Sequence, residues 1–228
     1  MTNRVWITRT EPAAERSASA WAAAGFRPIS APLLKIRPVR WDGTVADGSR
    51  LIFTSANAVR HCGLRGGAQH VYAVGDATAR AAREAGFDTV LSGKGDWQTL
   101  MDIIDSKDGP FLHLSGREVR GRIVETLRKC GAIAERAIVY ESVAVGGWPI
   151  DPEAIDGVAL YSPKAAETLM SLPPRNLARL TAYCLSETVA TPLESMDVRI
   201  AAEPNEDALI ACARNGFPGR SGTARTAP

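Results

Sequence analysis

Short apolar segments alternate with longer amphipathic segments along most of this chain of 228 residues, and this alternation constrains the fold more than any other feature. The apolar segments predict strands at residues 4–8, 51–54, 71–74, 89–91, 111–114, 158–161, 182–185 and 198–200. The segments between them predict helices at residues 11–24, 76–85, 96–104 and 205–214. Three further helices are predicted to begin at residues 55, 162 and 187, and one to end at residue 129. Gly25, Gly86 and Gly131 follow three of these helices as stop signals. Strands that alternate with helices of about 10–15 residues indicate βαβ units and a mostly parallel sheet.

Three pairs of segments resemble one another across the two halves of the chain. The pairs are residues 51–58 with 158–165, residues 71–79 with 182–190, and residues 5–9 with 111–117. Any two βα units share such a pattern, but the strands here also share a small hydroxyl residue at their ends, which favours a real internal repeat. The sequence therefore predicts two similar α/β units.

Charge and composition argue against several classes of protein. The 27 Lys and Arg against 25 Asp and Glu leave a net charge of +2, too little for a nucleic-acid-binding protein driven by bulk charge. No apolar run approaches the ~18 residues of a membrane span, and the first residues turn polar too early for a signal peptide. The four cysteines form no CxxC pair, and the three histidines share no metal-ligand spacing. We therefore expect a cytoplasmic monomer without a metal, a membrane or a nucleic-acid partner.

Small and hydroxyl side chains follow the carboxyl ends of the predicted strands. They are Thr8, Thr54, Ser55, Gly75, Ser115, Gly116, Ser162 and Ser186. Ligands of open parallel sheets bind beyond these strand ends, where exposed N–H groups at helix starts attract phosphate and carboxylate. One such hydroxyl is more often a plain helix cap, but six such ends on two units favour a cleft for a polyanion. Arg9, Arg117 and Lys164 lie just past strand ends and are candidates for added charge, although each is equally well explained as a surface residue.

Motifs of conventional catalysis are missing from the sequence. No GxGxxG follows a strand, no GxxxxGK[ST] phosphate loop occurs, and there is no GxSxG elbow. Residues 93–96 resemble a phosphate loop only superficially. The residues alone therefore predict a two-unit α/β protein with an anion-binding cleft and do not name a reaction.

Five short motifs occur in a definite order along the chain. They are residues 53–59 (FTSANAV), 71–79 (VYAVGDATA), 139–141 (VYE), 161–163 (YSP) and 184–190 (CLSETVA). Together they resemble the uroporphyrinogen-III synthase family, and the resemblance covers roughly residues 1–214.

The resemblance implies two flavodoxin-like α/β domains with parallel sheets, joined by a two-stranded linker. The implied ranges are residues 1–34 plus 148–215 for a discontinuous first domain, 39–139 for the second domain, and 35–38 with 140–147 for the linker. Both linkers fit breaks in the pattern, one at Pro38 and one in the loop-rich residues 140–149. Residues 216–228 are rich in Gly, Ser, Thr, Arg and Pro and are expected to form a disordered tail.

The resemblance also implies a reaction. The family converts linear hydroxymethylbilane to uroporphyrinogen III in haem biosynthesis, losing water, closing the ring and inverting its last pyrrole, ring D. The chemistry passes through an azafulvene cation and needs no cofactor, because the pyrroles supply the electrons. The substrate carries eight carboxylates, which fits an anion-binding cleft. Spontaneous closure gives the non-inverted isomer, so the control exerted by such a hydro-lyase is largely geometric.

Site residues follow from the same resemblance. Tyr140 matches the tyrosine that is the family's best candidate acid, and a tyrosine near its reference pKa of about 10 can donate a proton at neutral pH. A linker tyrosine packed between domains explains Tyr140 equally well. Thr54 and Ser55 match a substrate-binding Thr–Ser pair, and Asn57 lies one step further into the helix.

A loop in the second half of the chain departs from the family pattern. Residues 186–190 match a loop that usually reads glycine, any residue, threonine, threonine, alanine. Here Ser186 replaces the glycine and Val189 replaces a threonine, which leaves Thr188 as the candidate hydroxyl. Two alternatives therefore stay open: a non-catalytic two-lobed binding protein for an acidic small molecule, and a catalytically inactive relative of the synthase.

Overall fold

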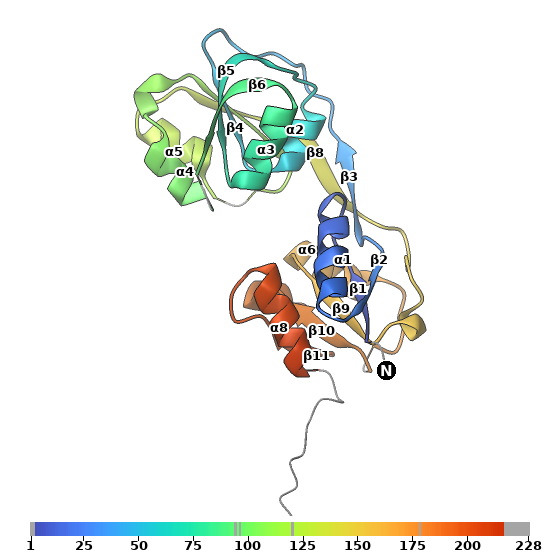
Figure 1. The fold of residues 1–228 in the computed structure, drawn as a ribbon. Coiled ribbons are helices and arrows are strands. Elements are labelled where there is room, and N and C mark those ends of the chain that lie inside the picture. Colours follow the sequence, from blue (N-terminus) through green and yellow to red (C-terminus); the bar gives the residue numbers. More distant parts are fainter. Residues whose placement is uncertain (1–2, 94, 96, 120, 178, 217–228) are drawn as a thin grey trace, which may run out of the picture. The chain divides into compact units, whose positions relative to one another are not determined.

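A computed structural model describes residues 3–93, 95, 97–119, 121–177 and 179–216. The chain divides into two compact units, which we call unit 1 (Met1–Lys35 with Val143–Pro228) and unit 2 (Ile36–Ser142) (Figure 1). Two sequence expectations lie outside the described residues: the tail beyond Gly216 and the helix start at Asp96. No helix in the described part of the chain is long and apolar enough to cross a membrane.

Unit 1 is built on a five-stranded sheet in the order β11-β10-β9-β1-β2, in which every pair is parallel. Its strands are β1 (Arg4–Ile7), β2 (Arg27–Ser30), β9 (Gly157–Leu160), β10 (Thr181–Cys184) and β11 (Asp197–Ile200). Its helices are α1 (Ala13–Ala23), the 3-10 turn η2 (Pro152–Ala154), α6 (Pro163–Ser171), α7 (Glu187–Ala190) and α8 (Glu206–Gly216). Along β1, Val5 and Ile7 pack with α1 and α8, whereas Trp6 packs with α6 and α7 on the opposite face. This alternation follows from the two-residue period of a strand.

Unit 2 is built on a six-stranded sheet in the order β3-β8-β7-β4-β5-β6. Its strands are β3 (Leu34–Pro38), β4 (Arg50–Phe53), β5 (Gly67–Ala73), β6 (Phe87–Ser92), β7 (Phe111–Gly116) and β8 (Ala134–Ala144). The first two residues of β3 and the last two of β8 fall within unit 1. Its helices are α2 (Ala56–His61), α3 (Asp76–Glu84), α4 (Trp97–Ile103), the 3-10 turn η1 (Ser106–Asp108) and α5 (Ile123–Lys129). Leu51 and Phe53 of β4 pack with α2 and α3, whereas Ile52 packs with α4 and α5.

The internal repeat predicted from the sequence is confirmed by the strand order. The strands β11-β10-β9-β1-β2 of unit 1 take the same positions as β6-β5-β4-β7-β8 of unit 2. The paired sequence segments lie in equivalent strands: β9 with β4, β10 with β5, and β1 with β7. Unit 1 has the flavodoxin order 2-1-3-4-5, and unit 2 has the same arrangement with the chain entering at a different strand. The α/β fold class with two parallel-sheet units is thus confirmed.

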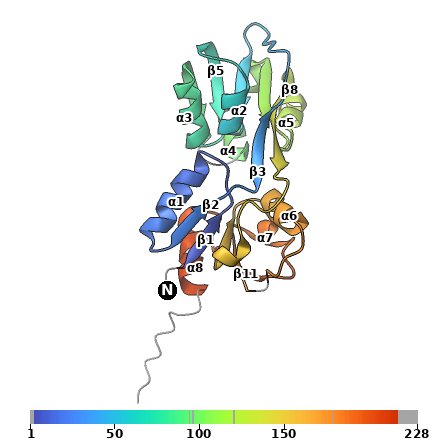
Figure 2. The same cartoon turned by 90° about the vertical axis from the view of Figure 1, so that its right-hand side faces the viewer.

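Three segments form β-strands that the sequence patterns do not predict. Strand β2 is absent from the sequence prediction, because Pro28 breaks its apolar pattern; as an edge strand, β2 tolerates a proline. The whole segment expected as the first linker, residues 35–38, belongs to edge strand β3, which ends on Pro38. The segment expected as the second linker, residues 140–147, is in strand β8 up to Ala144. Strands β3 and β8 lie side by side (Figure 2).

Candidate active site

The candidate residues lie after the central strands of each sheet. In a parallel sheet, the crevice for ligands forms where the strand order reverses. That point lies between β1 and β9 in unit 1 and between β4 and β7 in unit 2. The residues that follow these four strands are therefore the first candidates for contact with a ligand.

Thr54 and Ser55 follow β4 in unit 2 and lead into α2. Ser55 Oγ accepts a hydrogen bond from the backbone N–H of Asn57 at 3.2 Å, so Ser55 caps this helix. The side-chain oxygen of Asn57 accepts from Arg60 Nη1 at 3.5 Å. Thr54 Oγ1 instead lies 3.1 Å from Nε2 of His113 on strand β7. Thr54 thus links the two central strands, whereas Ser55 and Asn57 make contacts within the start of α2.

Gly75 joins β5 to α3 in the same unit. Its φ of +76° lies in the left-handed region, where a side chain on the residue would be strained. The turn brings α3, with Asp76 in its first turn, directly after the strand end. An acid at this position fits the positive end of the helix dipole.

Arg136 on β8 holds the end of β7 in place. Its Nε donates to Ser115 Oγ at 2.8 Å. Its Nη2 donates to the carbonyl oxygens of Gly116 at 2.6 Å and of Arg117 at 2.7 Å. Because Ser115 is fully buried, its hydroxyl belongs to this internal network. The guanidinium satisfies carbonyl groups at the point where the strand ends and thereby fixes the backbone there.

An irregularity in strand pairing places Tyr140. Ser115 pairs with Ile138 but Gly116 pairs with Tyr140, so Val139 is an extra residue on β8. Such a bulge bends its strand and re-aims the neighbouring side chains. The Tyr140 ring lies directly against Gly116, since a Cβ added to that glycine would be 2.6 Å from the ring Cζ and 2.9 Å from the hydroxyl oxygen.

The Tyr140 side chain is held by contacts of its ring and not by its hydroxyl. Tyr140 is half-buried, and its hydroxyl forms no hydrogen bond with the residues that the structure describes. The ring of His61 lies nearby, with its centroid 6.5 Å from that of Tyr140. The phenol is therefore held through its ring while its polar end is unoccupied by the described residues.

Glu141, the residue after Tyr140, forms ion pairs with two arginines. Its Oε2 accepts from Arg117 Nε at 2.7 Å, and its Oε1 accepts from Arg37 Nε at 2.7 Å and also from Arg37 Nη2. The glutamate side chain is 14% exposed, whereas those of Arg37 and Arg117 are 67% and 54% exposed. Hydrogen bonds from Arg117 and then Arg37 lower the pKa of Glu141. The three residues leave one positive charge in excess near the end of β7.

In unit 1, Arg9 is engaged with residues of its own unit. Its Nη1 donates to Glu206 Oε2 at 2.9 Å and to Ser17 Oγ at 3.2 Å, and its guanidinium lies 4.6 Å from the ring centre of Tyr161. Glu206 Oε1 accepts from the Tyr161 hydroxyl at 2.7 Å and from Trp21 Nε1 at 3.1 Å. Burial, and then the charge of Glu206, raise the pKa of Tyr161. This network ties β1 and β9 to α1 and α8 and balances the charge of Arg9.

Ser162 and Lys164 begin α6 after strand β9. Ser162 Oγ accepts from the backbone N–H of Ala165 at 3.2 Å, and Pro163 occupies the first helical turn, as the sequence predicts for a helix start. Lys164 is half-buried.

Two further candidates, the half-buried Ser186 and the exposed Thr188, follow β10. Ser186 precedes α7, and its side chain makes no capping hydrogen bond. Thr188 is exposed, whereas Val189 is 2% exposed and belongs to the apolar core beside α6. The replacement of a family threonine by Val189 therefore concerns a side chain that points into the core.

The structure brings one set of candidates together in unit 2 and another in unit 1. The set around the ends of β4 and β7 is Thr54, Ser55, Asn57, Ser115, Gly116 and Arg117, with Tyr140 on β8 beside Gly116 and with Gly75 after β5. The set in unit 1 is Arg9, Ser162, Lys164, Ser186 and Thr188. Sequence patterns miss His113, Arg136 and Glu141, of which only His113 carries a signal, as a polar residue in the middle of an apolar strand. No group of three His, Cys, Asp or Glu side chains suited to a metal occurs among the described residues.

Comparison with known proteins identifies the family. A comparison with curated protein sequences gives no match. Among solved structures, uroporphyrinogen-III synthetase from Helicobacter pylori aligns with a TM-score of 0.65 and 18% identity, covering 94% of this chain and 99% of that one. A mutant uroporphyrinogen III synthase from Thermus thermophilus aligns with a TM-score of 0.55 and 17% identity, covering 94% and 97%. These likenesses concern the fold. The family model described as uroporphyrinogen-III synthase HemD matches residues 15–211, so this chain belongs to the uroporphyrinogen-III synthase family.

Proposed function

We propose that this chain is a uroporphyrinogen-III synthase, which cyclises linear hydroxymethylbilane with loss of water and inversion of ring D. The observation that carries the proposal is the family match over residues 15–211. The geometry of unit 2 supports it, because the Tyr140 ring lies against Gly116 at the end of β7, and β7 is one of the two strands that border the switch point of this sheet. We further propose that the protein is a hydro-lyase of haem biosynthesis that works without a cofactor.

Tyr140 is the proposed general acid. Its hydroxyl gives a proton to the leaving hydroxyl of hydroxymethylbilane, water departs, and a cationic azafulvene remains. Attack by ring D then closes the ring, and the proton lost from the cyclised product returns the tyrosinate to tyrosine. The ring of Tyr140 is held against Gly116, so the direction of proton delivery is set by the β7–β8 pairing.

The remaining candidates bind the carboxylates of the substrate. Thr54 and Thr188 offer hydroxyl groups, Arg117 and Lys164 offer positive charge, and the backbone N–H groups at the starts of α3 and α6 offer further donors. We assign the same substrate-binding role to Ser55, Asn57, Gly75, Ser115, Gly116, Ser162, Ser186 and Arg9. The side chains of the buried Ser115 and the ion-paired Arg9 do not contact the substrate themselves in this proposal. They hold in place the backbone whose N–H groups bind it. Several weak contacts of this kind hold one conformer of a flexible tetrapyrrole, which favours inverted over direct closure.

The partner of the protein in this proposal is a small molecule alone. We propose a cytoplasmic monomer with no nucleic-acid partner and no membrane association, in line with its net charge of +2.

The decisive test is the identity of the product. The full-length protein is incubated with enzymatically generated hydroxymethylbilane, the products are oxidised to porphyrins, and the two isomers are separated by chromatography. A synthase gives the inverted type III isomer in excess. If only the non-inverted isomer forms while the protein binds the substrate, the chain is a two-lobed binding protein or an inactive relative of the synthases.

A further inference from the structure

His113 is a polar residue in an otherwise apolar layer of unit 2. It lies in β7 opposite Ile52 of β4, and its side chain faces the layer that contains Phe111, Ile123 and Leu127. The residue is 3% exposed. A buried imidazole costs stability unless it forms hydrogen bonds, and a leucine would fill such a site without this cost. We therefore expect a histidine at this position to have a hydrogen-bond partner.

That partner is the hydroxyl of Thr54. The distance between His113 Nε2 and Thr54 Oγ1 is 3.1 Å, and Thr54 lies at the carboxyl end of β4, in the crevice between β4 and β7. Only one hydrogen can lie between the threonine oxygen and the ring nitrogen. Either the ring donates to the threonine oxygen, or the threonine donates to the ring.

The charge state of the His113 ring decides which hydrogens are available for hydrogen bonds to Thr54 and from Thr54 to a ligand. Burial, and then the nearby charge of Arg136, lower the pKa of His113 to about 4, with Glu125 acting weakly in the opposite direction. The ring is therefore neutral at pH 7 and carries one hydrogen, on Nδ1 or on Nε2. With the hydrogen on Nε2, the ring donates to Thr54 Oγ1, and the hydrogen of the threonine hydroxyl is free to donate to a ligand.

We propose that His113 is a positioning residue of the synthase site, whose Nε2–H donates to Thr54 Oγ1 and so directs the Thr54 hydroxyl hydrogen toward a carboxylate of the substrate. A carboxylate only accepts hydrogen bonds, so a hydroxyl that meets it must keep its own hydrogen for it. The opposite arrangement would turn a lone pair toward the anion. The direction of the hydrogen bond thus matches an acidic substrate, and this inference rests on the proposed function.

The first experiment reads the direction of the hydrogen bond without relying on activity. The full-length protein is labelled with ¹⁵N in its histidine rings, and the ring nitrogen shifts are measured at pH 7, with His113→Gln used to assign the signal. We expect the His113 ring to carry its hydrogen on Nε2. A hydrogen on Nδ1, or a ring that exchanges between both forms, overturns the proposal whether or not the protein is a synthase.

The second experiment measures what the hydrogen bond does for the substrate. His113→Leu keeps the layer apolar and removes the donor, whereas His113→Gln keeps an N–H near the position of Nε2. We expect His113→Leu to raise KM for hydroxymethylbilane about tenfold with kcat largely kept, and His113→Gln to restore most of the loss. Adding Thr54→Val to His113→Leu should then cost little more, because both changes remove the same interaction.

A matched control separates positioning from general damage. His70 is an exposed histidine in the middle of β5, and His70→Leu should leave KM unchanged. A folded His113→Leu variant with the wild-type KM, or full additivity with Thr54→Val, would overturn the positioning role. Wild-type protein that makes no type III isomer would refute the proposed function, while the nitrogen shifts would still decide the direction of the hydrogen bond.

Discussion

Adding a single methyl group at Gly116 tests whether the place of the Tyr140 ring matters for the reaction. Gly116 does not need the left-handed backbone conformation that only glycine adopts easily, so Gly116→Ala changes space and not backbone strain. The new Cβ would lie 2.6 Å from Tyr140 Cζ and 2.9 Å from both Cε2 and the hydroxyl oxygen. Non-bonded carbon atoms need about 3.5–4.0 Å, so the end of the ring must move by roughly 1 Å.

This displacement predicts a large effect on turnover and a small one on folding. The atoms that must move belong to the end of a half-buried side chain, so we expect Gly116→Ala to lower the free energy of unfolding by only about 1 kcal/mol. A shift of about 1 Å in a group that delivers a proton can cost ~100-fold in rate. We therefore expect kcat to fall by one to two orders of magnitude (~10–100-fold) and the share of type III isomer to fall with it, because uncatalysed closure then competes.

The assay is isomer separation under initial-rate conditions, combined with urea unfolding of each variant. Gly157→Ala is the matched control: its Cβ would lie 2.8 Å from the ring of Tyr183, but at the start of β9, the end of the strand remote from the candidate site. We expect Gly157→Ala to destabilise unit 1 and to leave kcat unchanged in the folded fraction. Gly116→Ala with the wild-type kcat and isomer ratio would refute the argument that β7 holds the ring for catalysis.

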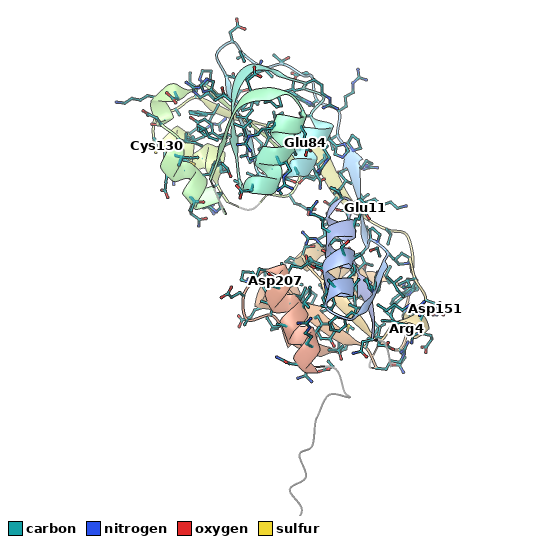
Figure 3. All side chains as sticks on the ribbon, in the orientation of Figure 1. Arg4, Glu11, Glu84, Cys130, Asp151 and Asp207 are labelled. Carbon is teal, nitrogen blue, oxygen red and sulfur yellow. The ribbon has the colours of Figure 1, made fainter. Side chains whose placement is uncertain are left out.

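Three further outcomes are expected. Tyr140→Phe should lower kcat by at least about 100-fold without unfolding the protein, as measured by isomer formation and circular dichroism, and a wild-type rate would remove its role as acid. Glu141→Gln should remove the carboxylate that orients the guanidinium groups of Arg117 and Arg37, and we expect KM to rise about three- to tenfold because this fixed orientation is lost. Asp156→Asn weakens the ion pair to Arg4 at the start of β1 (Arg4 is labelled in Figure 3) and should leave KM unchanged. Equal KM values for the two variants would contradict this role of Glu141. His113 should make the free energy of unfolding depend on pH. Its pKa is about 6.5 in the unfolded chain and about 4 in the folded protein, so unfolding takes up a proton at pH values between these two. The free energy of unfolding should therefore fall by roughly 3 kcal/mol as the pH drops from 6.5 to 4. Urea unfolding from pH 7 to pH 4 should show this extra loss in wild-type protein and not in His113→Gln, and parallel curves would count against it.

Local signals account for the parts of the fold that the sequence predicts well. Ser162 followed by Pro163 marks the start of α6 because both residues act within one helical turn. Gly86 marks the end of α3 in the same way, with a φ of +90°. The order of βα units and the internal repeat also follow from such signals, since each unit repeats the same local pattern.

Features that depend on distant partners were beyond the reach of the sequence. Nothing near Val139 indicates the bulge, which arises from the pairing of β8 with β7. Arg136 looks like a surface arginine until its carbonyl partners on β7 are known. Arg9 is a candidate for ligand charge in the sequence, yet Glu206, almost two hundred residues away, balances its charge in the fold. In each case the partner is chosen by the tertiary structure.

The insertion of unit 2 between β2 and β9 has a consequence for the order of folding. The hydrogen bond from Arg4 to Asp156 beside β9 joins residues 152 positions apart, whereas unit 2 is continuous in sequence and its end strands β3 and β8 pair with each other. Once unit 2 has formed, the loop that β1 and β9 must close is about threefold shorter, which lowers its entropic cost by roughly 1 kcal/mol. In pulse-labelled hydrogen exchange during refolding, amides of β4 and β5 should therefore gain protection before those of β9, and earlier protection of β9 would contradict this order. The chain would then fold from its middle outward.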